Sequence, residues 1–544
     1  MSGGARTVVV GFDALDFEYL DRFAGSLPTF ERLREDGVEA PLASTVPPWT
    51  GSAWPSMYTG TDPSYHGVSD FFAHDRYPDE TAVVSRNDVR RPAVWNYLSA
   101  DGASSVVLNV PVTHPAELIE GTLVPGYLAP EEAAGSPAGV RADLSAALGE
   151  EYRIYSRAET AADPDEKLAG YLELIDLRRR AAVELLTSRE WEVAVLEVQK
   201  TDAVFHNFDD EAAHRRVYEA ADEFLASVLA AVDEPVNVVV CSDHGIGHKD
   251  GYAVYLNEIL REHGYLEAAA DGSERSLSTV KTELTGEAAD DGAAPGAAAR
   301  AASGLQTALR RVGVTPADVY AAAQRVGVGD ALKAAVPSDL VGATAQVVDW
   351  RASDAFCRSN AEPGVRINLE GREPDGTVPA ERYDAVRDDI IAILREVQTP
   401  DGEPAFERVV PREEVYDGPQ ASDACDVIVV PNGANHTIGT KLYGRHFHEI
   451  DLYDHEPTGV FVARGPDVAA DASLSSLSLT DVAPLVMALS GRPVPERMTG
   501  TVPSGLVTRA VETADYGDVD FGTATTADVS EGAVTDRLED LGYL

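Results

Sequence analysis

Three short apolar runs constrain the fold of this chain most strongly, because acidic or imidazole side chains follow each of them. The runs cover residues 7–11, 193–198 and 236–240, and each has the length and composition of a buried β-strand. The side chains that follow them are, in chain order, Asp13, then Asp202 and His206, then Asp243 and His244. Open α/β sheets bind their ligands at the carboxyl ends of the strands. The pattern therefore predicts an α/β fold with a mostly parallel central sheet and a functional site at one edge.

A second feature is the segment at residues 45–70, which begins TVPPWTGSAW. Two consecutive prolines favour an extended approach, and helical spacing follows from about Thr50 to Tyr58, with Gly60 as a stop signal. This places Thr50 at the N-cap, where unpaired backbone N–H groups and the helix dipole favour a bound phosphate. Its hydroxyl becomes a nucleophile if a metal or a base removes the proton. On this segment alone, a purely capping role for Thr50 is favoured, because threonine caps are common.

The acidic and imidazole residues have spacings that suit metal ions. Asp202 and His206 are four residues apart and would share one face of a helix, although a surface helix can show the same spacing. Asp243 and His244 are adjacent, which suits a tight turn after a strand and also occurs as simple turn chemistry. His455 stands in DHEPTG before another apolar run, while His446 and His448 alternate in a way that could also bind metal. Together with Thr50, three Asp and three His suit two divalent ions.

The order of these motifs resembles the alkaline phosphatase superfamily, and within it the type I phosphodiesterase/nucleotide pyrophosphatase family. The matching pieces are GFDALD, PPWTGSAWPSMYTGTDPSYHG, TDAVFH, SDHG and HEPTGVFVARGP, with NVPVTHP as a lesser match. Each motif is weak alone, whereas the ordered set spans most of residues 1–505 and is strong.

The resemblance implies a phosphoester hydrolase of the phosphodiesterase or nucleotide pyrophosphatase type. It implies one divalent ion on Asp202, His206 and His455, and a second on Asp13, Thr50, Asp243 and His244. Zn²⁺ suits these ligands and Mn²⁺ is the alternative. Thr50 would attack the phosphorus of a small phosphate-ester substrate and form a phosphothreonine intermediate. Asn109, in NVPVTHP, could donate to a phosphoryl oxygen or pin the following loop.

Other activities share parts of this pattern. A phosphomonoesterase and a phosphomutase or phosphotransferase have the same two-metal core. A sulfatase needs Cys or Ser in a C/S-x-P-x-R context, and the sequence TGSAW at residues 50–54 excludes it. An acidic binding protein with a degenerate site is disfavoured because all seven positions are present.

The domain organisation follows from changes in composition. We expect residues 1–269 to form the N-terminal part of the catalytic core and residues 270–345 an insertion, partly low-complexity and helical. Residues 346–505 would complete the core and include a small α+β lobe, which reads strand, helix, strand over residues 365–410. Residues 506–544 would form an acidic C-terminal tail.

The formal net charge is −47, lysine is scarce, and acidic residues are spread along the whole chain. This distribution is typical of a halophilic surface, although an acidic partner-binding surface is an alternative. Binding to a nucleic-acid polymer is not expected, because no basic patch is present. No apolar stretch is long enough to span a membrane, and the N-terminal apolar run is too short for a signal peptide. We therefore expect a cytoplasmic protein, and the sequence carries no signature of a particular oligomeric state.

Overall fold

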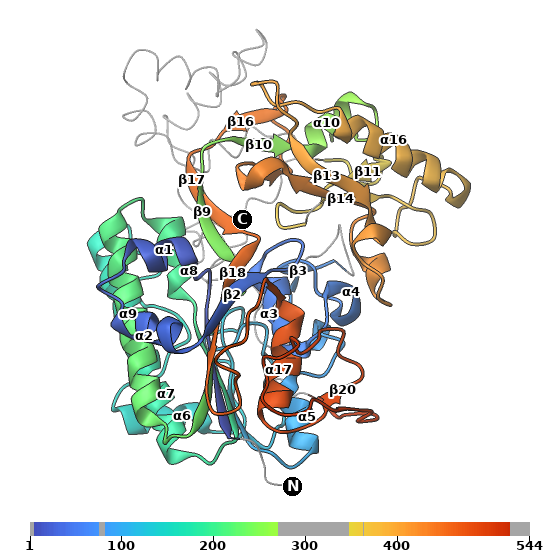
Figure 1. Ribbon diagram of the computed structural model, residues 1–544. Helices are drawn as coiled ribbons and strands as arrows, with labels where there is room; N and C mark the ends of the chain where they lie inside the picture. Colours follow the sequence, from blue (N-terminus) through green and yellow to red (C-terminus); the bar gives the residue numbers. More distant parts are fainter. Residues whose placement is uncertain (1–4, 75–81, 270–347, 363, 523–544) are drawn as a thin grey trace, which may run out of the picture.

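The central element of the fold is an eight-stranded sheet with the strand order β19-β2-β18-β8-β1-β7-β5-β6. The computed structural model describes residues 5–74, 82–269, 348–362 and 364–522 (Figure 1). The strands are β1 (Arg6–Phe12), β2 (Val38–Ala43), β5 (Ser105–Leu108), β6 (Gly121–Val124), β7 (Val193–Val198), β8 (Val236–Cys241), β18 (Thr458–Arg464) and β19 (Leu477–Ser478). Strands β8, β1, β7, β5 and β6 run parallel, and β18 is antiparallel to both of its neighbours. The predicted α/β fold with a mostly parallel sheet is confirmed.

The three apolar runs of the sequence are β1, β7 and β8, the middle strands of the sheet. Every residue of β7 and β8 is buried. In β1, Val8 and Val10 pack into one hydrophobic layer and Val9 packs into the other. A strand that is covered on both faces needs apolar side chains at consecutive positions rather than alternate ones, which explains the unbroken runs.

Helices cover both faces of the sheet, as Figure 1 shows. One face carries α1 (Phe17–Arg22), α2 (Pro28–Asp36), α6 (Val140–Leu148), α7 (Pro164–Ser188) and α9 (Glu211–Ala231). The other carries α3 (Thr50–Thr59), α5 (Val94–Ala100) and α17 (Val482–Leu489). A further helix, α8 (Lys200–Asn207), begins directly after β7 at the carboxyl edge of the sheet.

A smaller α+β lobe has its own core. Its antiparallel sheet has the order β11-β12-β14-β13, and helix α16 packs against it. The elements are β11 (Ala355–Phe356), β12 (Gly364–Ile367), α16 (Tyr383–Arg395), β13 (Phe406–Pro411) and β14 (Val427–Pro431). The strand, helix and strand expected over residues 365–410 are thus β12, α16 and β13.

A two-stranded ribbon joins the core to this lobe. Strands β9 (Gly245–Lys249) and β17 (Leu452–Glu456) pair antiparallel, with His455 opposite Ile246. Figure 1 shows the ribbon between the core and the lobe. It brings the C-terminal part of the chain to the end of β8, where the acidic motifs gather.

Other short α-helices and strands of the described residues lie outside the main sheet and the lobe sheet. They are α4 (Pro63–His66), β3 (Phe72–Ala73), β4 (Ala82–Val83), β10 (Tyr252–Tyr255), α10 (Leu256–Glu262), β15 (Thr437–Gly439), β16 (Phe447–Glu449), β20 (Val494–Pro495) and β21 (Thr513–Ala514). The insertion expected at residues 270–345 lies outside the described residues. The expected tail at residues 506–544 is described as far as residue 522, and β21 within it pairs with β20.

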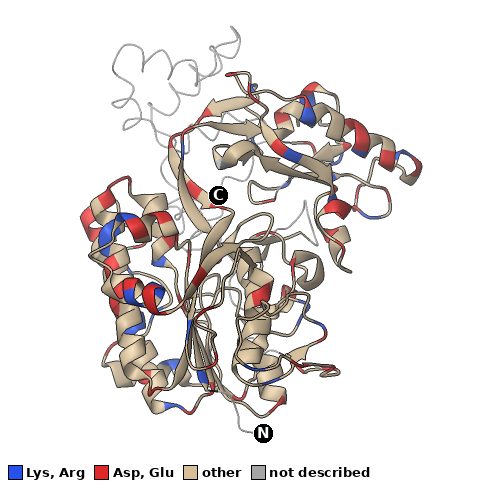
Figure 2. Ribbon diagram, in the orientation of Figure 1, with Lys and Arg blue, Asp and Glu red and all other residues tan. Residues whose placement is uncertain are grey.

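Acidic residues are spread over the helices of the core and over α16 of the lobe, rather than gathered in one segment (Figure 2). Within the described ranges, no helix combines the length and the apolar character that crossing a membrane would need.

Candidate active site

The first group of site residues surrounds the Thr50 hydroxyl. Thr50 Oγ1 lies 3.4 Å from Asp13 Oδ1 and 3.4 Å from His244 Nε2. His244 Nε2 is also 3.3 Å from Asp243 Oδ2. All four side chains are fully buried. The turns after β1 and β8 and the start of α3 therefore place these groups around one point.

The second group consists of Asp202, His206 and His455. His206 Nε2 lies 3.1 Å from Asp202 Oδ1 and 3.2 Å from His455 Nε2, and His455 Nε2 is 3.5 Å from the same Asp202 oxygen. Asp202 and His206 share one face of α8, as their spacing predicts. His455 is the penultimate residue of β17, near the carboxyl end of that strand, and the pairing of β17 with β9 brings it to the core.

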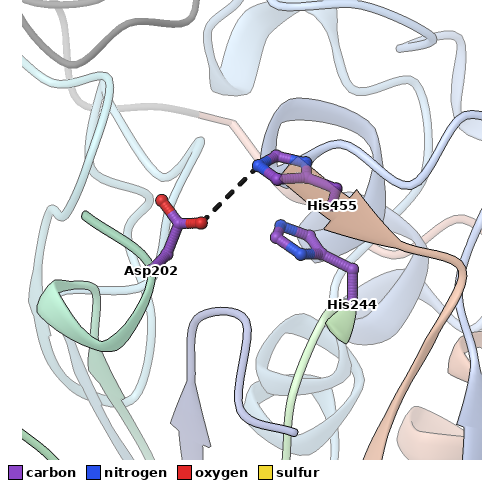
Figure 3. Close-up of side chains that lie close together, drawn as sticks. All are labelled: Asp202, His244 and His455. Atoms are coloured by element: carbon purple, nitrogen blue, oxygen red, sulfur yellow. Dashed lines mark ion pairs between the residues drawn. The ribbon is translucent and has the colours of Figure 1, made fainter. Parts of the chain in front are cut away.

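The two groups are in contact through stacked imidazole rings. The ring centroids of His244 and His455 are 3.8 Å apart, with an angle of 19° between the ring planes. Figure 3 shows these two rings facing the Asp202 carboxylate. Two sets of side chains have ligand atoms within 4.8 Å of one another, namely Asp13, Asp243 and His244, and Asp202, His244 and His455.

Backbone carbonyls orient both stacked imidazoles. His244 Nδ1 is 2.9 Å from Gly245 O, and His455 Nδ1 is 2.8 Å from Pro48 O. Because a carbonyl only accepts, each Nδ1 carries the proton and donates it. When the ring is neutral, each Nε2 therefore presents a lone pair towards the carboxylates, which is the form of histidine that binds metal.

Burial and close charged neighbours shift the pKa values of the site residues. Burial raises the pKa of the Asp13 carboxyl well above its ordinary value, and Asp243 and Asp202 raise it further. Burial also raises the pKa of Asp243, although His244 opposes this effect. Burial and the neighbouring His244 and His206 lower the pKa of His455 well below its ordinary range. The protein alone therefore disfavours the charged forms of these groups.

The donor set fits divalent cations. Asp13 Oδ2 and Asp243 Oδ2 are buried and have no hydrogen-bond partner. An unpaired buried carboxylate oxygen is costly unless a cation or a proton satisfies it. Carboxylate oxygens and imidazole nitrogens are ligands of Zn²⁺ and Mn²⁺.

The expected N-cap position of Thr50 is wrong by one residue. Helix α3 begins at Thr50, and Trp49 is the N-cap with an extended backbone. Thr50 therefore lies in the first turn, with its hydroxyl turned towards Asp13 and His244 rather than capping the helix. A Cβ on the following Gly51 would come within 3.1 Å of the Asp70 carbonyl oxygen, so the close packing behind Thr50 favours glycine there.

Asn109 lies directly after β5, with a positive φ of 63°. Its Oδ1 accepts a hydrogen bond from the Tyr152 hydroxyl, whereas its buried Nδ2 has no hydrogen-bond partner. The donor end is thus available, and a contact with a phosphoryl oxygen remains a prediction.

Sequence reasoning missed two buried ion pairs next to the site. Lys200 Nζ lies 2.5 Å from Glu159 Oε1, and Arg178 Nη1 lies 3.3 Å from Glu197 Oε2. Burial raises the pKa of Glu197 to about 8, although Arg178 opposes this shift. Lys200 and Glu197 stand at the end of the second apolar run. A charged residue next to a buried strand indicates that it has an oppositely charged partner elsewhere in the chain.

The histidines outside the two groups have other contacts. His446 pairs with Glu262 at 2.8 Å, and His248 pairs with Asp451 at 2.8 Å. Among the described residues, neither belongs to a cluster with metal-ligand geometry. This favours His455 over His446 as the C-terminal ligand.

Comparisons with known proteins identify the family of the chain. A model of the family described as type I phosphodiesterase/nucleotide pyrophosphatase matches residues 7–455. The chain belongs to this family, within the alkaline phosphatase superfamily, and it is a phosphoric ester hydrolase. The matched range contains all seven residues of the two groups.

Solved structures share the fold. Phosphonoacetate hydrolase from Sinorhizobium meliloti, in complex with phosphonoformate, is 16% identical with a TM-score of 0.54, over 90% of this chain and 96% of that chain. Murine ectonucleotide pyrophosphatase/phosphodiesterase 5 is 12% identical with a TM-score of 0.50, over 92% of this chain and 100% of that chain. A comparison with curated proteins found no match.

Proposed function

We propose that this protein is a metal-dependent phosphodiesterase that uses Thr50 as its nucleophile. The observation that carries the proposal is the convergence of carboxylate oxygens and imidazole nitrogens around the Thr50 hydroxyl. Thr50 Oγ1 has an aspartate oxygen and a histidine nitrogen at 3.4 Å each. Substrate would be a small phosphate ester.

Two divalent cations, Zn²⁺ or Mn²⁺, would be held by the residues described above. Asp202, His206 and His455 would hold one, and Asp13, Thr50, Asp243 and His244 the other. When bound, such cations lower the pKa of a coordinated hydroxyl and stabilise negative charge on phosphoryl oxygens. The Oδ2 atoms of Asp13 and Asp243, which have no hydrogen-bond partner, support this assignment.

The role of Thr50 follows from its position. Its Oγ1 loses the hydroxyl proton to solvent and forms a bond to phosphorus, while the bond from phosphorus to the leaving oxygen breaks in line with it and the leaving group departs with that electron pair. The product of this step is a phosphorylated Thr50, which still carries the second ester group if the substrate is a diester. Water then attacks phosphorus, the bond to Thr50 Oγ breaks, and the hydroxyl regains a proton.

The contacts of the neighbouring cationic side chains support a diester rather than a monoester. A monoester dianion needs additional positive charge, which an arginine or lysine often supplies. The cationic side chains described beside the site, Lys200 and Arg178, each face a carboxylate of their own. Glu197 and Glu159 thus already occupy contact positions on these two cationic groups.

The test is a side-by-side assay of the wild type and Thr50→Ala on bis(4-nitrophenyl) phosphate and 4-nitrophenyl phosphate. We expect the wild type to cleave the diester faster, and Thr50→Ala to lose activity on both. Full activity of Thr50→Ala would refute the nucleophile. Faster cleavage of the monoester would be compatible with Thr50 as the nucleophile, but it would show that the substrate is a phosphomonoester.

A further inference from the structure

A cavity of about 550 Å³ opens between the catalytic core and the lobe. The core contributes Trp49, Phe205 and Tyr453, and the lobe contributes strand β14 through Val429 and Val430. His206 and His455 also line it. The cavity therefore adjoins the candidate active site, and its far wall is built by a part of the chain that contains none of the seven site residues.

The lining of the cavity is mostly apolar, and its charged side chains are mostly acidic. Pro47, Pro48, Ile438 and the aromatic rings line it, and Asp209, Glu407 and Asp454 add negative charge. Lys249 is the basic residue of the lining, but its Nζ lies 3.3 Å from Glu456 Oε1. An apolar surface with acidic neighbours favours an uncharged group and repels an anionic one.

The position of the cavity relative to Thr50 indicates which part of the substrate it takes. His206 and His455 belong to the group around Asp202, whereas Thr50 belongs to the group around Asp13. In an in-line displacement the leaving oxygen departs from the side opposite the nucleophile. The leaving group would therefore point towards His206 and His455, and into the cavity.

Resting on the proposed phosphodiesterase function, we propose that this cavity binds the leaving group and selects substrates in which that group is apolar and carries no negative charge. Aryl and alkyl groups fit this description. Phosphate-bearing leaving groups, such as the pyrophosphate of a nucleoside triphosphate, do not. The lobe would then set the specificity of the enzyme through strand β14.

The first arm of the test reduces the cavity. Val430 is half-buried on β14, where an aromatic side chain is compatible with a strand, and Val430→Trp would fill the space beside it. The substrates are methyl 4-nitrophenyl phosphate, with one ring in its leaving group, and methyl 4-methylumbelliferyl phosphate, with two. Val511→Trp, at a 43% exposed position, is the matched control.

We expect Val430→Trp to lower kcat/KM for the larger leaving group by roughly tenfold more than for the smaller one. Val511→Trp should treat the two substrates as the wild type does. Ile438→Phe makes the same test from β15 if Val430→Trp does not fold. Equal effects of a folded cavity variant on both substrates would overturn the proposal.

The second arm tests charge. We expect the wild type to have a lower kcat/KM for a substrate whose leaving group carries a carboxylate than for the matching uncharged substrate. Glu407→Gln should bring the ratio of these two kcat/KM values closer to one, and more so at low salt than at high salt. An unchanged ratio would contradict the electrostatic part of the proposal. If Thr50→Ala kept full activity, the phosphodiesterase mechanism itself would fail, which is a separate outcome from equal effects of the cavity variants.

Discussion

The Nε2 atoms of His206 and His455 lie 3.2 Å apart, although 249 residues separate the two histidines in the chain. Because His455 donates its Nδ1 proton to Pro48 O, its Nε2 offers only a lone pair in the neutral ring. The position between these two nitrogens and the Asp202 carboxylate therefore attracts a positive charge, either a proton or a cation.

This relationship leads to a prediction about metal content. We expect the purified protein to hold about two divalent ions per chain, and a chelator to abolish activity until metal is returned. His455→Ala should lower the metal content by about one ion, because it removes a ligand from one of the two sites. Elemental analysis measures this directly.

The control for this prediction is His248→Ala, whose ring pairs with Asp451 at the surface. It should leave the metal content unchanged. Wild-type protein without bound transition metal, and with activity that resists chelation, would contradict the two-metal site.

A second prediction concerns acid stability of the lobe. Asp426 is buried in the lobe and receives two hydrogen bonds from Arg372, at 2.7 Å each, and one from Arg412 at 2.9 Å. Burial alone would raise the pKa of Asp426, but these arginines hold it at about 2. In the unfolded chain the value is about 3.9. The contacts of Asp426 with the two arginines therefore stabilise the fold above about pH 4, and this contribution is lost as the pH falls towards about 2.

Asp426→Asn should lower the free energy of unfolding by about 3 to 5 kcal/mol at neutral pH, because the buried Arg412 and the half-buried Arg372 lose their counter-charge. The difference from wild type should shrink between about pH 4 and pH 2 in denaturant melts. The exposed Asp384→Asn serves as control, since its side chain is 81% exposed. A difference that grows on acidification would rule out this account.

The third prediction concerns salt. The net charge of −47 is spread over core and lobe (Figure 2), so self-repulsion should destabilise the fold at low ionic strength. The Debye length falls from about 10 Å at 0.1 M to about 3 Å at 1 M salt. Thermal midpoints should rise steeply with KCl and much less with sucrose at equal osmolality. A flat response to KCl would instead favour an acidic partner-binding surface.

Much of the fold and of the site was open to prediction from the sequence. The runs that form β1, β7 and β8 are continuous because helices cover both faces, and the residues after them are placed by the ends of these strands. The spacing of Asp202 and His206 likewise placed both on one face of α8.

The contacts made by distant segments could not be read from local patterns. His455 reaches His244 through the pairing of β17 with β9, and neither strand has a distinctive periodicity. The same limit applies to the pair of Lys200 with Glu159, which are 41 residues apart. The start of helix α3 differs by one residue from the expected one, because the sequence defines helix ends poorly.

The most direct measurement of the central claim is capture of the covalent intermediate on Thr50. Wild-type protein mixed with methyl 4-nitrophenyl phosphate is quenched in acid, digested and analysed by mass spectrometry. We expect a methylphosphoryl group on the peptide that contains Thr50, and none in Thr50→Ala, whose kcat falls by roughly three orders of magnitude or more. Thr50→Ser should retain partial activity and Ser52→Ala most of it. A modified residue other than Thr50, or turnover by Thr50→Ala at the wild-type rate, would contradict the account.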